Sequence, residues 1–247
     1  MSKRGSGVDE ITSRADALIG AQKWTEAEAL LLDGLETAAR EGRQSMELSL
    51  CSELMGFYRQ RNDARGFYAA RDRAFSLLEA IRVDALARGT ILINAATGMV
   101  AFGECRDALD VYREAESCYR RALGSGDVRL AALNNNMAFA FAGCGENARA
   151  EGKIKEAVAI LEKLPHHPDL GTSYVNLALL YAGTDAADPR IGECLDKAED
   201  CFDDPEMIWD GYYAHTARKC AGGFAALGRQ KEADDLEERA EMIYAGT

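Results

Sequence analysis

The sequence predicts an all-α fold of stacked helical hairpins, and two observations support this prediction. The chain has 247 residues and only four prolines, so little interrupts helix formation, because proline breaks helices while Ala, Leu and Glu favour them. In addition, a phrase returns about every 41 residues, beginning at Asn94, Asn136 and Asn176. A period of this length is typical of α-solenoids, in which each unit is a helix, a turn and a second helix.

The residue that opens the phrase serves as an anchor for the whole chain. Successive anchors are 40, 41, 42, 40 and 43 residues apart: Ser13, Glu53, Asn94, Asn136, Asn176 and Lys219. Two positions after the anchor the residue is small in every unit except at Met55, and five positions after it the residue is always large and apolar. A small residue lets a neighbouring helix approach closely and a large one fills the space beside it. The repetition therefore predicts how the helices pack.

A second helix is expected in each unit. It carries another recurrent small residue, at Gly34, Ala74, Ala115, Ala157, Ala198 and Ala240. Turn signals separate the two helices at Gln22-Lys23, Gly103-Glu104, Gly143 to Gly145 and Gly228-Arg229. Thr25 and Glu28 have the spacing of a capping box, which predicts that the second helix of the first unit begins there.

The absence of a Ser-rich or Gly-rich linker predicts one continuous domain over residues 8–245, after a flexible N-terminus of residues 1–7. The expected units lie near 8–42, 45–82, 86–124, 128–165, 169–204 and 208–245.

These patterns resemble the tetratricopeptide repeat (TPR) family. The matching residues are Leu177-Ala178 with Tyr181, and Gly103 with Ala108, Tyr112 and Ala115. The step of about 41 residues, the Asn before the Leu-Ala pair, and His167-Pro168-Asp169 are more similar to the longer repeats of kinesin light chains. The resemblance implies a right-handed α-solenoid of about six repeats and about twelve antiparallel helices. It also implies that the first helix of each repeat lines a concave surface.

Composition excludes several partners and compartments. A formal net charge of -12 repels phosphate backbones, which argues against nucleic acid. Seven cysteines without paired spacing favour a reducing compartment, and the cytoplasm is therefore expected. The sequence contains no long apolar segment, so neither a membrane span nor a secretion signal is predicted.

The anchor asparagines are the candidate binding residues. At 100° per residue, Asn94, Asn136 and Asn176 are expected to point away from the packed stripe of their helices. Each amide has both donors and an acceptor, so a row of them can hold the N–H and C=O groups of an extended peptide. Thr97 and Asn135 are further peptide-binding candidates. The alternative is structural, because asparagines also form local bonds within helices, above all in the run Asn134 to Asn136.

Charged residues are expected at the two ends of the groove. Arg59 lies toward the N-terminal end, while His215, Arg218 and Lys219 gather in the sixth unit, where they could hold a carboxylate. The alternative is that they are ordinary exposed charges. The segment 185–210 contains ten acidic residues, which indicates either a solvated outer face or a docking patch for a basic partner.

The sequence does not predict an enzyme, a metal site or a cofactor. His166-His167 has no further ligands at a useful spacing and matches a turn between repeats. Cys194 and Cys201 are two helical turns apart, which favours core packing. No phosphate-binding glycine loop or nucleophile elbow is present.

The leading hypothesis is a protein-protein interaction scaffold that binds an extended peptide or protein tail in its groove. One alternative is a sensor of a short signalling peptide that acts through a separate effector protein. Another is a homo-oligomer, in which exposed residues of the terminal unit pack on a second copy. The residues expected to be exposed there are Tyr212, Tyr213, Phe224 and Ala225.

Overall fold

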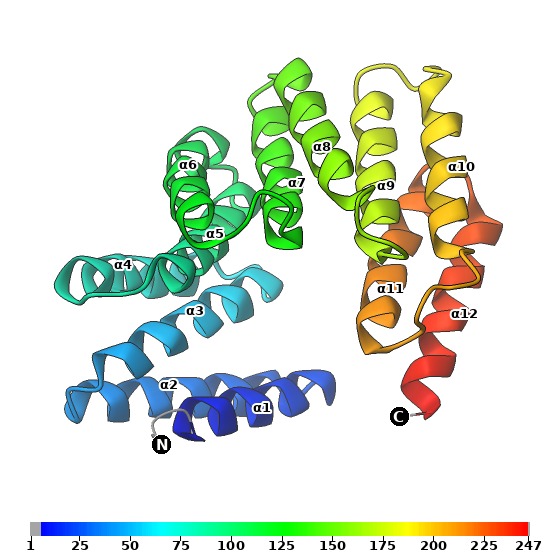
Figure 1. The fold of residues 1–247 in the computed structure, drawn as a ribbon. Coiled ribbons are helices and arrows are strands. Elements are labelled where there is room, and N and C mark those ends of the chain that lie inside the picture. The colour runs from blue at the N-terminus through cyan, green and yellow to red at the C-terminus, as the bar shows by residue number, and fades with distance from the viewer. Residues whose placement is uncertain (1–5, 247) are drawn as a thin grey trace. The chain divides into compact units, whose positions relative to one another are not determined.

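The computed structural model describes residues 6–246, and this part of the chain forms twelve helices and no strand (Figure 1). The predicted all-α class and the expected number of helices are therefore confirmed. The helices are α1 (Ser6–Gly20), α2 (Trp24–Arg40), α3 (Gln44–Gln60), α4 (Ala64–Ala80), α5 (Ala85–Ala101), α6 (Cys105–Ala122), α7 (Val128–Gly143), α8 (Asn147–Leu161), α9 (Pro168–Ala182), α10 (Arg190–Phe202), α11 (Gly211–Ala226) and α12 (Gln230–Gly246).

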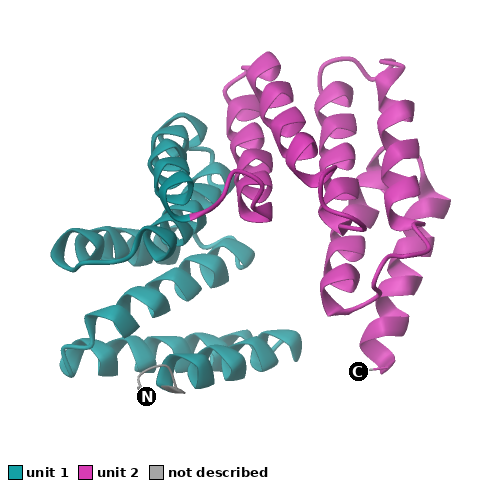
Figure 2. Cartoon of the chain, in the orientation of Figure 1, with its two compact units in different colours: residues 1–122 teal, residues 123–247 magenta. Residues whose placement is uncertain are grey.

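The helices fall into two compact units, residues 1–122 with α1 to α6 and residues 123–247 with α7 to α12 (Figure 2). Within each unit, consecutive helices pair as hairpins, and first helices also pack on each other, α3 against α5 and α9 against α11. The single domain over 8–245 stays a prediction. Residues 1–5 of the expected flexible N-terminus lie outside the described residues, whereas residues 6 and 7 belong to α1.

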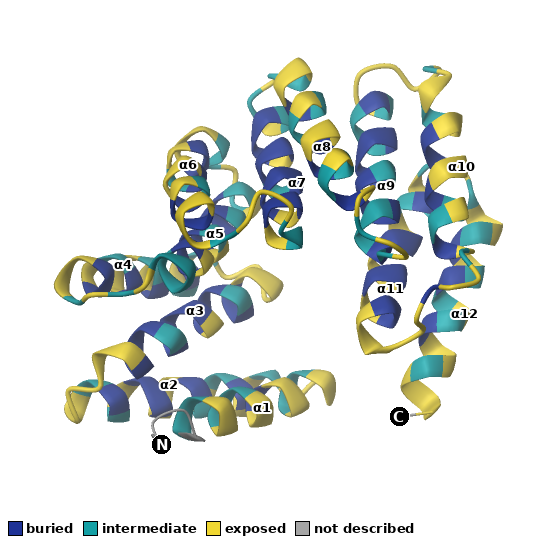
Figure 3. Ribbon diagram, in the orientation of Figure 1, coloured by how far each residue is buried: buried dark blue, intermediate teal, exposed yellow. Residues whose placement is uncertain are grey.

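The packing pattern read from the sequence is confirmed. The small residue two positions after each anchor, and Met55 in its place, is buried in all six hairpins. The large residue five positions after the anchor is buried in every hairpin except the first, where Leu18 is half-buried. The recurrent small residues of the second helices are buried as well. Buried positions accordingly form stripes along the helices (Figure 3), as expected for an amphipathic helix that packs on one side.

Glycine permits one close helix contact that bears on the site described below. A Cβ atom built at Gly223 on α11 would overlap the side chain of Val175 on α9. The neighbouring Gly222 has open space around it. Gly223 therefore allows α11 to lie close against α9.

Three of the predicted turns have glycine in the left-handed region, Gly103 at φ 89°, Gly145 at φ 76° and Gly228 at φ 82°. Glycine adopts this conformation without a steric penalty, which is why it ends so many helices. Gln22 takes the same place after α1, with φ 58°.

The predicted capping box is wrong. Helix α2 begins at Trp24, and the residue before it, Lys23, makes no side-chain cap. The turn that ends α1 leads directly into α2, so Thr25 already lies inside the first turn of the helix. Glu28 instead accepts a hydrogen bond from Tyr58 Oη on α3, at 3.0 Å. None of the described helices is long and apolar enough to cross a membrane.

Candidate functional site

The first helices of the second unit, α7, α9 and α11, together line a polar hollow. Its open space is about 690 Å³, including solvent at its mouth, and ligand sites typically range from about 300 to 1,000 Å³. We call it the polar hollow. It is lined by Ala132, Asn135, Asn136, Phe139, Asp169, Thr172, Asn176, Tyr212, His215, Thr216 and Lys219.

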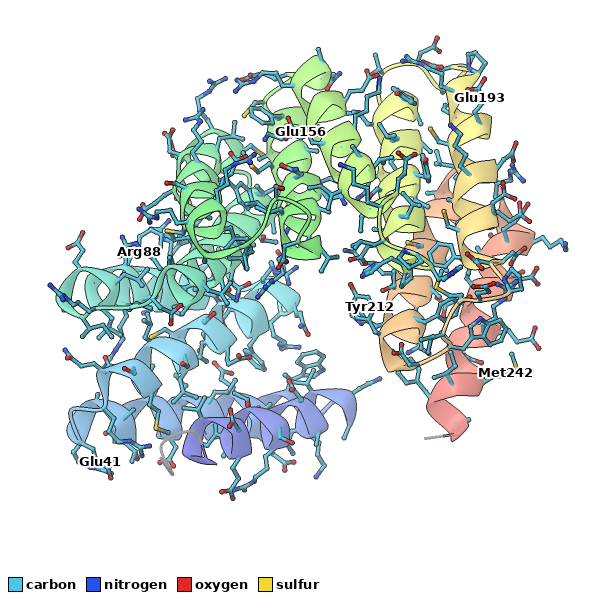
Figure 4. All side chains as sticks on the ribbon, in the orientation of Figure 1. Glu41, Arg88, Glu156, Glu193, Tyr212 and Met242 are labelled. Carbon is cyan, nitrogen blue, oxygen red and sulfur yellow. The ribbon has the colours of Figure 1, made fainter. Side chains whose placement is uncertain are left out.

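The repeat register explains why these side chains meet. The anchors Asn136, Asn176 and Lys219 occupy equivalent positions on three first helices, so they form one row across the hollow. Asp169 and Tyr212 lie seven residues before their anchors, which is two turns along the same helix face. Figure 4 shows Tyr212 at the start of α11. The structure thus brings five predicted site residues together: Asn135, Asn136, Asn176, His215 and Lys219.

Two of the asparagines are joined by hydrogen bonds between helices. Asn176 Nδ2 donates to Asn135 Oδ1 at 3.2 Å, and Asn135 Nδ2 donates to Ser173 Oγ at 2.8 Å. Ser173 Oγ in turn donates to the backbone oxygen of Asp169 at 3.0 Å. Asn176 is only 9% exposed and Asn135 only 7%. The expectation that Asn176 points away from the packed surface is therefore wrong, because α9 has a first helix packed on either side.

Three other groups of the polar hollow have no such partners. Asn136 is half-buried, and His215 and Lys219 are exposed. Among the residues that the structure describes, none forms a hydrogen bond or ion pair with the side chain of Asn136, His215 or Lys219. Their donors and acceptors are therefore available to a ligand.

A carboxylate and a phenol lie at one end of the polar hollow. Tyr212 Oη donates to Asp169 Oδ2 at 2.7 Å, which links α11 to α9. Burial raises the pKa of Tyr212, and the bond to Asp169 raises it further, so the hydroxyl remains protonated at neutral pH. Neither residue was predicted to belong to a peptide-binding site, although Tyr212 was expected to be exposed, as it is. The sequence signal that could have identified them is their spacing, since Asp169 lies seven residues before Asn176 and Tyr212 lies seven residues before Lys219.

Arg218 does not belong to the cationic group with which it was predicted. Its guanidinium Nε lies 3.4 Å from Glu237 Oε2 on α12, and its Cζ lies 4.8 Å from the centre of the Tyr244 ring. One residue along a helix turns the side chain by about 100°. Arg218 therefore faces α12, while Lys219 lines the polar hollow.

The remaining predicted residues lie in the first unit. Asn94 on α5 is exposed and donates from Nδ2 to Ser52 Oγ on α3 at 2.8 Å. Thr97 Oγ1 and the buried Tyr112 Oη lie 2.9 Å apart. Arg59 is exposed near the end of α3. None of the three lines the polar hollow.

A second, mostly apolar hollow lies beside the polar one, between α7, α8 and α9. The two hollows share Phe139 and Asn176. Its other lining residues are Ala138, Ala142, Asn147, Ile154, Leu179, Leu180 and Gly183. A ligand in the polar hollow therefore has an apolar surface within reach, to which the half-exposed ring of Phe139 belongs.

The histidine pair forms a turn, as the sequence indicated. His167 caps α9 by accepting a hydrogen bond from the backbone N–H of Asp169 at 3.3 Å. His166 Nδ1 lies 2.7 Å from Asp204 Oδ2 and His166 Nε2 lies 2.9 Å from Glu206 Oε2. The bond to Asp204 raises the pKa of His166. Within residues 6–246, no group of three or more His, Cys, Asp or Glu residues is arranged to hold a metal ion.

Two further expectations concern the terminal hairpins. Cys194 is buried and Cys201 is half-buried, and burial raises the pKa of both thiols, that of Cys201 to about 11. This favours packing over reactivity, since the thiolate is the reactive form. The expected exposure of Tyr213 and Phe224 is wrong, because both are buried in the hairpin of α11 and α12.

Comparisons with known proteins support the fold. No model of a known protein family matches the chain, and no curated protein matches its sequence. Similar solved structures include RapI in its apo form, with a TM-score of 0.59 and 10% identity over 96% of this chain and 97% of that chain. BtubC (BKLC) from P. vanneervenii has a TM-score of 0.57 and 18% identity over 98% of this chain and 92% of that chain.

A putative kinesin light chain of Podospora anserina, with nearly identical TPR-like repeats, is also similar. Its TM-score is 0.54, with 20% identity over 81% of this chain and 95% of that chain. The fold is therefore that of TPR-like helical repeats, as the sequence predicted.

Proposed function

We propose that this chain is a non-enzymatic interaction module that binds an extended peptide or protein tail across α7, α9 and α11. The observation that carries the proposal is the row of equivalent polar side chains, Asn136, Asn176 and Lys219, along one face of three successive helices. An enclosed enzyme site needs groups that converge on one reacting atom, whereas a row suits a ligand that is itself extended. No cofactor is required for this role.

The polar hollow offers the groups that a peptide needs. Asn136 can donate to a peptide C=O and accept from a peptide N–H. Lys219 and His215 can hold a carbonyl or carboxylate, and Phe139 offers an apolar surface beside them. Each hydrogen bond contributes about 0.5 to 1.5 kcal/mol net. After the cost of ordering the peptide, a few such contacts correspond to micromolar affinity.

A variant that fills the polar hollow tests this proposal. Ala132 is exposed and lines the polar hollow, so Ala132→Trp blocks it without removing a polar group. Ala148 is also an exposed helical alanine but lines neither hollow, so Ala148→Trp is the matched control. Peptides are first selected with the unmodified protein from a displayed library of random dodecapeptides, and their affinities are measured by fluorescence polarisation.

We expect Ala132→Trp to weaken binding of the selected peptides at least tenfold, and Ala148→Trp to leave it unchanged. Circular dichroism must show that both variants keep their helices. Equal binding to both variants would contradict a site in the polar hollow. Failure to select any peptide would contradict peptide binding itself.

Self-association is a second candidate function, because large apolar side chains are exposed on α12 and on the connection between α10 and α11. Ile208 is 75% exposed, Trp209 49%, Met242 54% and Tyr244 43%. Figure 4 shows Met242 on α12. Light scattering across a hundredfold range of concentration tests this candidate. A mass that stays that of one chain would exclude it, and a mass that rises in the unmodified protein but not in Trp209→Ser would support it.

A further inference from the structure

The second hollow, between α7, α8 and α9, differs in chemistry from the polar hollow, and we call it the apolar hollow. Its open space is about 590 Å³, including solvent at its mouth. None of the nine described residues that line it is charged. Ala138 and Ile154 in its lining are buried, and Leu179 and Leu180 are half-buried. An apolar group that replaces water in contact with such a surface gains free energy.

A difference between the two units explains why space is left here. In the first unit, Phe67 on α4 lies fourteen residues after its anchor, is fully buried, and would overlap a Cβ atom built at Gly98 on α5. The residue fourteen positions after the anchor in the hairpin of α7 and α8 is Ala150. The second unit therefore lacks the ring that packs against α5 in the first. The residue equivalent to Gly98 is Leu180, which lines the apolar hollow.

The apolar hollow suits a side chain better than a peptide backbone. Both of its polar side chains are already bonded within the protein. Asn147 donates from Nδ2 to Thr184 Oγ1 at 3.1 Å, and Asn176 donates from Nδ2 to Asn135. The N–H and C=O groups of a peptide lose free energy when they leave water for an apolar surface without forming hydrogen bonds. An apolar side chain carries no such cost, so it is the part of a peptide that fits.

The two hollows follow each other along α7. The lining of the polar hollow on this helix ends at Phe139, and that of the apolar hollow continues to Ala142. These two residues are about 4.5 Å apart along the helix axis, which is within the length of a Leu, Met or Phe side chain. A peptide whose main chain lies in the polar hollow can therefore place one side chain in the apolar hollow.

We propose that the apolar hollow is the specificity pocket of this module and takes one large apolar side chain of the bound peptide, of the size of Leu, Met or Phe. The pocket rests on the proposed peptide binding and names the class of ligand. Burial of such a side chain strengthens binding by about ten- to hundredfold, which is as much as or more than a single hydrogen bond in the polar hollow supplies. Peptides that lack a large apolar residue at this position are accordingly rejected.

Alanine replacement within the peptide measures this preference on the unmodified protein. Each position of a selected dodecapeptide is replaced in turn, and affinity is measured by fluorescence polarisation. We expect one position, occupied by a large apolar residue, at which alanine weakens binding at least tenfold. Photo-leucine placed at that position should crosslink to residues 138–142 or 179–183, as mapped by mass spectrometry.

A variant that fills the apolar hollow should remove the preference. Ala142 and Ala182 are both half-buried, and both lie six residues after their anchors, but of the two only Ala142 lines the apolar hollow. In Ala142→Phe, alanine at the sensitive peptide position should weaken binding about threefold or less. In the matched control Ala182→Phe the loss should stay at least tenfold. Circular dichroism checks that both variants are folded.

The outcomes distinguish the pocket from the proposed function. Failure to obtain any binding peptide would overturn peptide binding, and the pocket with it. Peptides that bind without a sensitive apolar position would overturn the pocket alone. The pocket would also be wrong if photo-leucine labelled other residues, such as Ile208 or Trp209, or if the folded Ala142→Phe kept the tenfold preference.

Discussion

The two units of the molecule make the same contact between first helices but use it differently. In the first unit, the anchor Asn94 on α5 donates to Ser52, the residue before the anchor of α3. In the second, the anchor Asn176 on α9 donates to Asn135, the residue before the anchor of α7. The contact ends at Ser52 in one unit, whereas Asn135 continues it to Ser173 in the other. Two of the three anchor asparagines, Asn94 and Asn176, therefore join neighbouring repeats, whereas Asn136 does not.

Peptide binding, as proposed, depends on the polar side chains that those contacts between first helices leave without a partner. The second unit keeps the amide of Asn136 and the ammonium of Lys219 free of partners among the described residues, in one hollow. Two anchors of the first unit differ from these: Asn94 is bonded to Ser52, and desolvation, with the nearby Asp16, raises the pKa of Glu53. The following predictions test this contrast.

The largest expected effect on stability is at the contact between α9 and α11. Gly223→Ala should lower the free energy of unfolding by about 1 to 3 kcal/mol, because its Cβ would overlap Val175, a stiff side chain. Gly222→Ala, one residue earlier and in open space, should be neutral or stabilising by up to about 1 kcal/mol. Urea denaturation measures both. Equal effects would show that α11 does not lie close against α9.

The hydrogen bonds that join Asn176 to Asn135 and Asn135 to Ser173 predict the next largest effect on stability. Asn135→Ala should cost about 1 to 3 kcal/mol, because it leaves the buried amide of Asn176 without its acceptor and removes the donor to Ser173 Oγ, which keeps only its bond to the backbone of Asp169. Asn94→Ala, at an exposed residue with a single bond, should cost less than about 1 kcal/mol. Urea denaturation of both variants compares the two units. The contrast between them would be wrong if Asn94→Ala proved the more damaging.

One contact should have the same strength in both units. Tyr58 Oη donates to Glu28 in the first unit and Tyr181 Oη donates to Glu151 in the second, both at 3.0 Å. Both tyrosines stand five residues after their anchors, and both bonds are partly buried. Tyr58→Phe and Tyr181→Phe should therefore each cost about 0.5 to 1.5 kcal/mol. A difference larger than that range, measured by thermal unfolding, would show that the repeats are not equivalent here.

The smallest expected effect is a pH dependence confined to the second unit. The folded pKa of His166 is raised by its bond to Asp204, so the folded state binds the proton more tightly than the unfolded state. The resulting stabilisation is fully present below the unfolded pKa of about 6.5 and is lost as the pH rises through the folded pKa. Urea midpoints between pH 5.5 and 8.5 should show this decrease. His166→Asn should remove that decrease, and a decrease that persisted in the variant would assign it to another group.

Much of the fold could be predicted because its cause is local and repeated. The Ala and aromatic positions recur at fixed distances from each anchor, so one helix period identifies the buried face of all six hairpins. The division into two units falls beside Gly124-Ser125-Gly126, but a run of three such residues is too short to distinguish a linker from an ordinary turn between repeats.

The site could be predicted only in part, because a helical angle does not say which neighbour covers it. Asn135, Asn136 and Asn176 were placed on the right helices, but the bond that buries Asn176 depends on how close α7 lies to α9. Asp169 and Tyr212 meet only through the packing of α9 against α11. Arg218 was grouped with Lys219 by sequence proximity, although adjacent residues on a helix face different directions.

A charge reversal in each unit tests most directly whether the polar hollow is the binding surface. Lys219→Glu changes the exposed cation of the polar hollow, and Arg59→Glu changes an exposed cation of the first unit. Affinity is measured by fluorescence polarisation with one peptide selected by the unmodified protein, at matched ionic strength. We expect at least a tenfold loss for Lys219→Glu and no change for Arg59→Glu. A loss for Arg59→Glu with full binding by Lys219→Glu would contradict binding in the polar hollow.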